Sequence, residues 1–181
     1  MAWTAPSTWV AGAILTAAQL NEQLRDNMNF LAVPNMCRAR STTATGIPTS
    51  VATVVPLAAA DSYDTAAMHS PTVNNSRVTV NLIGVYSITG ELYIEGFNSG
   101  SQRIIIIYKN GAEIQSVTVP PPGAFISRLN ITILDYASSA TDYYEMYAYH
   151  DRAAGVGLNL SATGAGGETA SLAVTYMGAT A

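Results

Sequence analysis

The chain has 181 residues, the length of one domain with at most a short appendage. Charged residues make up 11% of it, against about 25% in an average globular domain, and the formal net charge is −4. The acidic balance and the scattered Lys and Arg residues exclude sequence-independent nucleic-acid binding, and no apolar run approaches the ~20 residues that span a bilayer, so no membrane insertion is expected.

The first element that the sequence predicts is a short amphipathic helix over about residues 16–32. Thr16 and Gln19 form a capping-box pattern at its start, and Pro34 ends it. One face is apolar at helical spacing and the opposite face is polar. The apolar residues of this helix and of the leader before it are predicted to anchor the chain to a larger assembly: Trp3, Trp9, Leu15, Leu20, Leu24, Met28 and Leu31.

Two kinds of partner remain open for this apolar stripe. A single helix of this length is marginal in water unless packing stabilises it, so the stripe must bury against something. It either docks on the β-domain of the same chain or packs against copies of itself or a neighbouring protein. The two tryptophans favour the second alternative, because Trp is enriched at interface anchors. We therefore divide the chain into an attachment segment, residues 1–36, and a head domain, residues 37–181.

From residue 37 onward, short apolar runs separated by Gly, Pro and Asn replace the helical period. Seven or more short strands with regular turn signals predict a mainly β fold: an antiparallel jelly-roll β-sandwich with one short N-terminal α-helix. The dipeptide Asn110-Gly111 between two apolar runs is the strongest hairpin signal in the chain. Residues 119–123, Val-Pro-Pro-Pro-Gly, cannot lie within a sheet and predict a stiff surface loop.

Four consecutive isoleucines, residues 104–107, leave their strand without a polar face. Both sides of that strand should be covered, either within one domain or by another chain at a subunit interface. The tyrosine-rich run 143–149 also carries aromatic residues on both sides. These two runs predict a subunit interface formed by Ile105, Ile107, Tyr144, Met146 and Tyr147.

Four segments in order resemble the globular head of the complement and tumour-necrosis-factor superfamily: residues 84–95, 103–111, 142–151 and 170–178. The positions that match motifs of that superfamily are Gly84, Tyr86 and Gly90, then Asn110 and Gly111, then Tyr144, Met146 and Ala148. The resemblance implies a compact jelly roll that assembles as a homotrimer, which makes the predicted subunit interface a trimer interface. The chain lacks the collagen-like Gly-x-y stalk and the signal peptide of secreted members.

The front of the chain is similar to the leader of phage structural proteins. In those proteins a Trp-containing stretch precedes a Thr-Ala-x-x-Leu-Asn-x-x-Leu-Arg-Asp-Asn pattern. The matching residues are Thr16, Ala17, Leu20, Asn21, Leu24, Arg25, Asp26 and Asn27. This resemblance implies a virion protein, assembled in the host cytoplasm, that binds other virion proteins of the tail or capsid through its N-terminal segment.

The histidines and the cysteine predict no catalytic or metal site. His69 and His150, the only histidines, lie in no metal-spaced motif. Asp151 should point to the opposite face of a strand from His150, so it cannot orient that ring for catalysis. Cys37 is the only cysteine, so neither a disulfide nor a cysteine metal cluster is expected.

The pairs of carboxylates in the sequence also predict no glycosidase active site. The nearest pairs in sequence are Asp61 with Asp64 and Glu91 with Glu95. On a strand, Glu91 and Glu95 share one face but lie about 13 Å apart, too far for either glycosidase geometry. We predict a non-enzymatic protein without cofactors or a metal.

The predicted function is that of a phage structural protein, the trimeric head of a tail fibre or tail tip that binds a host-surface glycan or protein. Loops on a rigid sandwich are the usual carriers of recognition. A capsid decoration or head-fibre protein that ornaments or stabilises the shell is the alternative, and a secreted signalling jelly roll is a third. The residues predicted to face a receptor are Asn98, Ser99, Pro121, Phe125, Ser138, His150 and Arg152.

Overall fold

The computed structural model of the chain describes residues 4–153, 157–162 and 167–179. Two compact units divide the chain: an N-terminal unit, Met1–Asn35, and a head, Met36–Ala181. Within the described ranges, no helix is both long enough and apolar enough to cross a membrane.

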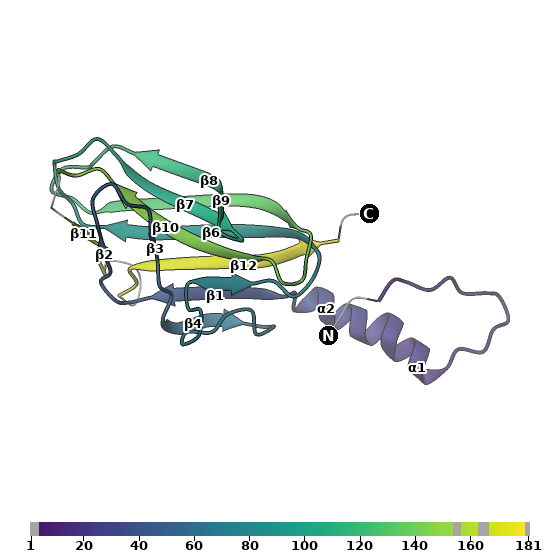
Figure 1. Cartoon of the computed structure of the whole chain (residues 1–181). Helices are drawn as coiled ribbons and strands as arrows, with labels where there is room; N and C mark the ends of the chain where they lie inside the picture. The colour runs from purple at the N-terminus through teal and green to yellow at the C-terminus, as the bar shows by residue number, and fades with distance from the viewer. Residues whose placement is uncertain (1–3, 154–156, 163–166, 180–181) are drawn as a thin grey trace. The chain divides into compact units, whose positions relative to one another are not determined.

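The N-terminal unit contains one helix in three consecutive segments: α1 (Ala17–Leu20), a π-helical segment (Asn21–Asp26) and α2 (Asn27–Ala32) (Figure 1). The predicted capping box is confirmed. Thr16 Oγ1 accepts a hydrogen bond from the Gln19 N–H at 3.2 Å, and Gln19 Oε1 accepts one from the Thr16 N–H at 2.9 Å. The helix ends at Val33, whose backbone is non-helical because the residue before Pro34 avoids the helical region.

The leader runs back along this helix and is held by two amide side chains. Asn27 pairs with the backbone of Thr4, accepting from its N–H at 3.0 Å and donating to its carbonyl at 2.9 Å. Four residues earlier, Gln23 Oε1 accepts from the Ser7 N–H at 2.7 Å. Because positions i and i+4 share a helix face, the leader covers one face of the helix.

The head is a sandwich of two antiparallel sheets, as the sequence predicts (Figure 1). The first, called the β6 sheet, has the order β4 (Ala59–Asp64), β1 (Met36–Ser41), β12 (Ala170–Gly178), β6 (Gly84–Ile94) and β9 (Ser127–Ala137). The second, called the β7 sheet, has the order β3 (Thr53–Val54), β10 (Tyr143–His150), β7 (Arg103–Lys109) and β8 (Ala112–Val119), and β5 (Arg77–Thr79) also pairs with β10. A small third sheet joins β2 (Gly46–Ile47) to β11 (Leu158–Asn159).

The core lies between the two large sheets. Side chains alternate along β6, so that Tyr86 and Ile88 are fully buried while the residues between them face outward. A Cβ atom at Gly90 would lie only 3.0 Å from Ile107 Cδ1 and from Met146 Sδ on the opposite sheet. Glycine at this position therefore lets the β7 sheet pack closely over β6.

Two predicted turns are confirmed. Asn110 and Gly111 connect β7 to β8 with φ angles of 52° and 81°, the left-handed region that this hairpin requires. The triple-proline segment follows the end of β8 at Val119 and precedes the start of β9 at Ser127, so it lies in a loop.

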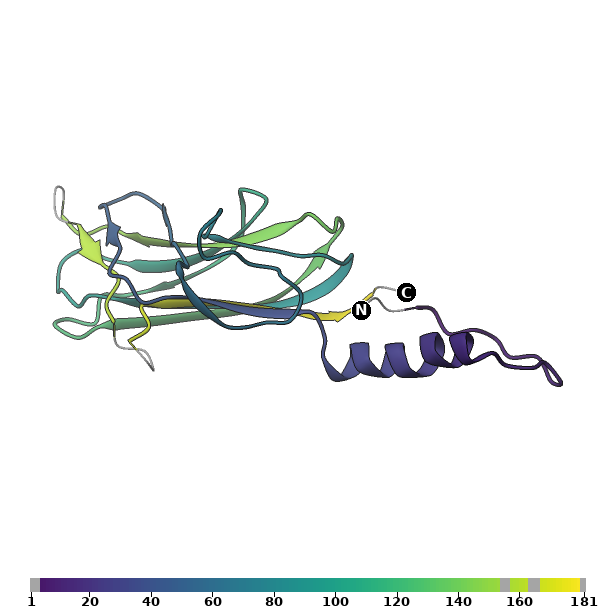
Figure 2. The same cartoon turned by 90° about the horizontal axis from the view of Figure 1, so that it is seen from below.

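The strands run along the length of the head, so its loops gather at two ends (Figure 2). Met36, the first residue of the head, pairs with Thr175 on β12. Ser41, at the other end of β1, pairs with Ala170, which in turn pairs with Leu92 near the end of β6. We call the end at Met36 proximal and the end at Ser41 distal. The loops after β6, after β8 and after β10 are all distal.

Candidate functional site

The distal loop of residues 95–102 contacts two further loops, residues 120–126 and 151–153, and we call the three the distal loop cluster. Arg152 Nε donates to Ser99 Oγ at 2.9 Å, and the Arg152 guanidinium lies 3.8 Å from the centroid of a phenylalanine ring in the first loop, Phe97. A Cβ atom at Gly96 would collide with the Phe125 carbonyl, so the backbones of the first two loops touch. Segments that are distant in sequence therefore make one surface.

Asp151 fixes the loop 95–102 from the β10 side. Its Oδ1 accepts hydrogen bonds from the N–H groups of Ser101 at 2.8 Å and Gln102 at 2.9 Å, and the Ser101 hydroxyl donates to Oδ2. These hydrogen bonds, led by that of the Ser101 hydroxyl, lower the pKa of Asp151 to about 2. The carboxylate is therefore charged at neutral pH and holds the loop.

Arg103 fixes the same loop from beneath. Its side chain is fully buried and donates to the carbonyl oxygens of Gln102 at 2.9 Å, Ser99 at 3.0 Å and Phe97 at 3.3 Å. Burial lowers the pKa of this arginine, which nevertheless stays protonated. Carbonyl dipoles thus stabilise its charge, and the loop is held by Arg103, Asp151 and Arg152 together.

Most of the residues predicted to face a receptor lie in the distal loop cluster. Phe125 is the most prominent of them, with 77% of its surface exposed. Ser138 lies instead at the proximal end, between β9 and β10, where its N–H donates to Asp142 at 2.9 Å. Residues 154–156, in the loop after β10, lie outside the described residues. The predicted residues that the cluster brings together are Asn98, Ser99, Pro121, Phe125 and Arg152.

His150 is not a surface residue, so the prediction that it faces a receptor is wrong. It is fully buried: its Nε2 donates to the Ile47 carbonyl at 2.8 Å, and its Nδ1 accepts from the Arg152 N–H at 3.1 Å. Only the neutral ring can make both bonds, and burial lowers the pKa of this histidine accordingly. His150 is a structural link between β10 and β2 beneath the cluster.

Four of the five residues predicted at the trimer interface are core residues of the single chain. Each is fully buried between the two sheets, so a second chain cannot reach it, and this part of the prediction is wrong: Ile105, Ile107, Tyr144 and Met146. Burial, with a hydrogen bond to Asp135 at 2.7 Å, raises the pKa of the Tyr144 hydroxyl. Tyr147, the fifth residue, lies on the outer face of the β7 sheet.

The outer side of the isoleucine strand is covered within the chain. Ile106 is 5% exposed and pairs in register with Tyr147 on β10. The rings of Tyr108 and Tyr147 lie 4.1 Å apart, centroid to centroid, on this face. Tyrosines of the same sheet therefore shield the isoleucines, and this strand needs no second chain for its cover.

A group of apolar residues on the outer face of the β6 sheet was missed by the sequence reasoning. Leu134 is 68% exposed, and Tyr136 and Met177 are exposed as well. The register places Tyr136 opposite Val85, and Val85 opposite Gly178 beside Met177. We call Val85, Leu134, Tyr136 and Met177 the proximal apolar patch. The sequence does indicate this patch. Along the outer face of β9 the residues are polar up to Thr132, and the next two on that face, Leu134 and Tyr136, are apolar or aromatic.

The predicted anchor residues are exposed wherever they are described. Trp3 lies outside the described residues. The helix carries an exposed apolar stripe, Leu20, Leu24, Met28 and Leu31, and a stripe of this kind is typical of a site that binds another chain. Trp9 and Leu15, in the leader before the helix, are exposed as well.

Neither protein-family models nor curated proteins match this sequence. Solved structures do match. The globular domain of zebrafish complement 1qA protein has a TM-score of 0.56 and 8% identity, covering 81% of this chain and 99% of its own. Murine APRIL has a TM-score of 0.53 and 10% identity, covering 78% and 98%. The head has a C1q/TNF-like jelly-roll fold.

A third structure with this fold, PRD1 vertex protein P5, has a TM-score of 0.53 and 12% identity, covering 80% of this chain and 72% of its own. The four segments that resemble the superfamily in sequence are central strands of the C1q/TNF-like jelly roll. They form two neighbouring pairs, β6 with β12 in one sheet and β7 with β10 in the other. The motifs thus mark the middle of both sheets.

Proposed function

We propose that this protein is a non-enzymatic virion spike, a homotrimeric head that binds the host cell surface through its distal loop cluster and is attached through its N-terminal unit. The observation that carries the proposal is that the point of attachment and the candidate binding loops lie at opposite ends of the head. The chain enters at Met36, at the proximal end, and the distal loop cluster, whose loop 95–102 is fixed by Arg103, Asp151 and Arg152, lies at the distal end of the same strands.

The fold supports the trimer and the absence of catalysis. C1q/TNF-like domains typically form homotrimers and are non-catalytic. In a monomer the proximal apolar patch is left in water, and a neighbouring chain would cover it. We place the trimer interface on the outer face of the β6 sheet, around this patch.

The rest of that outer face suits contact with a second chain. Thr89 and Thr132 hydrogen-bond across β6 and β9 at 3.0 Å. Both arginines of β1 are paired with one carboxylate, since Glu168 lies 2.7 Å from Arg38 and 3.2 Å from Arg40. The Arg40 guanidinium also donates to the Ala60 carbonyl, so both arginines are hydrogen-bonded within the chain, and a second chain over this face would meet one net positive charge.

The N-terminal unit supports attachment to a virion. Its exposed apolar stripe offers a surface for another protein, and its sequence is similar to the leader of phage structural proteins. PRD1 vertex protein P5, a vertex protein by name, shares the fold of the head and supports a virion location.

The chemistry of the distal loop cluster supports recognition of a glycan or protein. Phe125 exposes an aromatic ring that can anchor a ligand, and the other two loops of the cluster carry the amide of Asn98 and the guanidinium of Arg152. A fixed loop binds with less entropic cost than a mobile one, because it is already ordered before contact.

The test compares binding of labelled wild-type protein and two variants to cells of the host bacterium. Phe125→Ala should reduce the affinity for cells about tenfold, equivalent to about 1.4 kcal/mol. Val73→Ala, a similarly exposed apolar residue in the loop between β4 and β5, should leave the affinity unchanged. Equal binding by all three proteins, or equal losses in both variants, would refute recognition by the distal loop cluster.

Capsid decoration is the second candidate, and the likeness to PRD1 vertex protein P5 favours it. Immunogold labelling of intact particles separates the two functions. Label at the tail tip supports the spike that binds the host. Label over the capsid, with normal adsorption of particles that lack the protein, supports decoration.

A further inference from the structure

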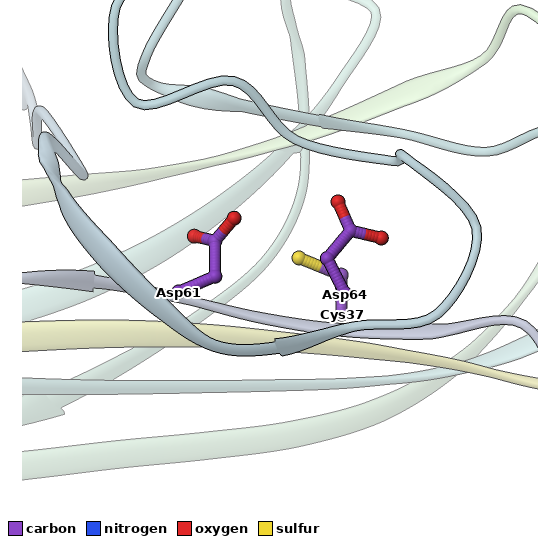
Figure 3. A group of neighbouring side chains, drawn as sticks. All are labelled: Cys37, Asp61 and Asp64. Atoms are coloured by element: carbon purple, nitrogen blue, oxygen red, sulfur yellow. The ribbon is translucent and has the colours of Figure 1, made fainter.

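A buried cysteine faces two carboxylates near the proximal end of the head. Cys37 on β1 pairs in register with Asp64 on β4, and Asp61 lies on the same strand as Asp64. The Cys37 Sγ and one carboxylate oxygen from each aspartate all lie within 4.8 Å of one another. Figure 3 shows the sulfur atom pointing toward the space between the two carboxylates.

This cluster carries little compensating positive charge among the residues that the structure describes. Several other carboxylates of the head pair with arginine or lysine, as Glu168 does with Arg38 at 2.7 Å and Asp135 with Lys109 at 2.8 Å. Within the described ranges, the one side chain paired with a carboxylate of the cluster is His69, whose Nδ1 lies 2.8 Å from Asp61 Oδ1. One histidine can supply at most one positive charge to two carboxylates.

The thiol of Cys37 is the unsatisfied group of the cluster. It is fully buried and, within the described ranges, no hydrogen bond to its sulfur is found. Burial and the nearby carboxylates of Asp64 and Asp61 raise the pKa of the thiol, so it is protonated in the metal-free protein. A cation between the sulfur and the carboxylates would reverse this, because metal coordination favours the thiolate.

The surrounding residues hold both carboxylates in place. Asp64 accepts hydrogen bonds from the backbone N–H groups of Ala66 at 3.1 Å, Met68 at 3.0 Å and His69 at 2.9 Å. Asp61 is oriented by the His69 ring, which is itself buried and lies 3.2 Å from the Asn75 carbonyl. Outer contacts of this kind fix the direction of metal ligands in known sites.

We propose that Cys37, Asp61 and Asp64 bind one divalent cation of the zinc class, with His69 outside the coordination shell as a positioning residue for Asp61. A thiolate ligand favours Zn²⁺ over Mg²⁺ or Ca²⁺, which prefer oxygen ligands alone. Binding releases the thiol proton of Cys37 to solvent, and no other bond forms or breaks besides those to the metal.

The donor atoms need only a small movement to meet on one ion. Zinc lies about 2.3 Å from sulfur and about 2.0–2.2 Å from carboxylate oxygen, so two donors on a tetrahedral ion are roughly 3.4–3.6 Å apart. The three donors are already within 4.8 Å of one another, and small shifts of the Cys37 and Asp61 side chains close the remaining gap while Asp64 keeps its backbone hydrogen bonds. The partly exposed Asp61 provides the path from solvent.

The ion would tie the edge strand β4 to the strand with which the head begins. β4 pairs with β1 through a register that shifts between Arg38 and Arg40. Beside the cluster, two hydrogen bonds join the segments. The Met36 N–H donates to the Thr65 hydroxyl oxygen at 3.0 Å, and the Thr65 N–H donates to the Met36 carbonyl at 3.0 Å. A bound ion would add a further link between these two segments at the proximal end.

The experiment titrates chelator-stripped full-length protein with Co²⁺ and then with Zn²⁺. One equivalent of Co²⁺ per chain should give a visible tetrahedral spectrum and a near-ultraviolet cobalt–thiolate band, both lost when Zn²⁺ displaces it. Cys37→Ser should abolish the thiolate band and weaken Zn²⁺ binding at least tenfold, and Asp61→Asn should weaken it similarly. Glu113→Gln, an exposed carboxylate on β8, is the matched control and should bind as the wild type does.

Saturating Co²⁺ without a thiolate band in the wild-type protein overturns the site. Unchanged Zn²⁺ affinity in Cys37→Ser overturns it as well, because the ion is then bound elsewhere. If Cys37→Ser does not fold, Asp61→Asn replaces it, since that side chain is partly exposed and the substitution keeps its size. If neither variant folds, the cobalt spectrum of the wild-type protein decides alone.

Discussion

The Nε atom of Arg152 lies 2.9 Å from the hydroxyl of Ser99, although the two residues are 53 positions apart in the chain. This bond joins the loop after β10 to the loop after β6. The neighbouring Asp151 binds the far side of the same loop through Ser101 and Gln102. Two adjacent residues of opposite charge thus hold the loop 95–102 in one conformation.

Arg152→Ala should loosen the loop 95–102 while the head stays folded. The substitution removes one hydrogen bond and one contact with the Phe97 ring, together worth about 1–2 kcal/mol. Amide hydrogen exchange should become faster in residues 97–102. Arg77→Ala is the matched control, because Arg77 lies 4.1 Å from the Tyr143 ring at the proximal end and does not touch this loop. Unchanged exchange in the loop of Arg152→Ala would contradict the role assigned to the arginine.

The head should lose stability below neutral pH through His150. Its pKa in the folded chain is below the ordinary value of about 6.5, so the unfolded chain binds more protons as the pH falls through that value. The stability present above about pH 6.5 is then lost toward the folded pKa, at no more than about 1.4 kcal/mol per pH unit. Urea unfolding from pH 7.5 to 5 measures this loss. His150→Gln, which retains a donor and an acceptor, should show a flatter pH dependence, and parallel curves would refute the assignment.

Leu134→Asp should convert a trimeric head into monomers. Each buried leucine contributes about 1.5–3 kcal/mol, and the substitution would also place a carboxylate in the proximal apolar patch of every subunit. Analytical ultracentrifugation measures the oligomeric state of the protein. Thr118→Asp, on an exposed position of β8, is the control and should remain trimeric. A wild-type protein that sediments as a monomer at micromolar concentration would be incompatible with the proposed trimer.

Leu24→Asp should leave the head folded but prevent incorporation into particles, because it places a charge in the exposed apolar stripe of the helix. Immunoblots of purified particles measure incorporation, and circular dichroism checks the fold. Ala18→Asp is the control, since it adds the same charge in the first helical turn, where a carboxylate is favourable. Equal incorporation of Leu24→Asp and the wild type would argue against attachment through this stripe.

Features with local signals could be predicted from the sequence. The Asn110-Gly111 turn and the Thr16–Gln19 capping box each depend on neighbouring residues alone, and both are found. The succession of short alternating runs was likewise enough to predict two packed antiparallel sheets.

Features that depend on tertiary neighbours could not be predicted. The isoleucine row shows that both sides of β7 are covered, but only the register reveals that Tyr147 lies beside Ile106. His150 follows an exposed pattern in sequence and is buried because the Ile47 carbonyl meets its ring. Cys37 lies near Asp61 and Asp64 only because β1 pairs with β4. The spacing of these residues in the sequence therefore does not predict a metal site.

The chain enters the head at one end of β1, and the distal loops stand at the other. Tension between these ends acts along the strands and across the hydrogen bonds that join β1 to β12. Six residue pairs, from Met36–Thr175 to Ser41–Ala170, are then sheared together instead of being unzipped in succession. This geometry should resist a steady mechanical force between the two ends of the head, such as the force that flow would exert on a particle bound to a cell in the proposed function.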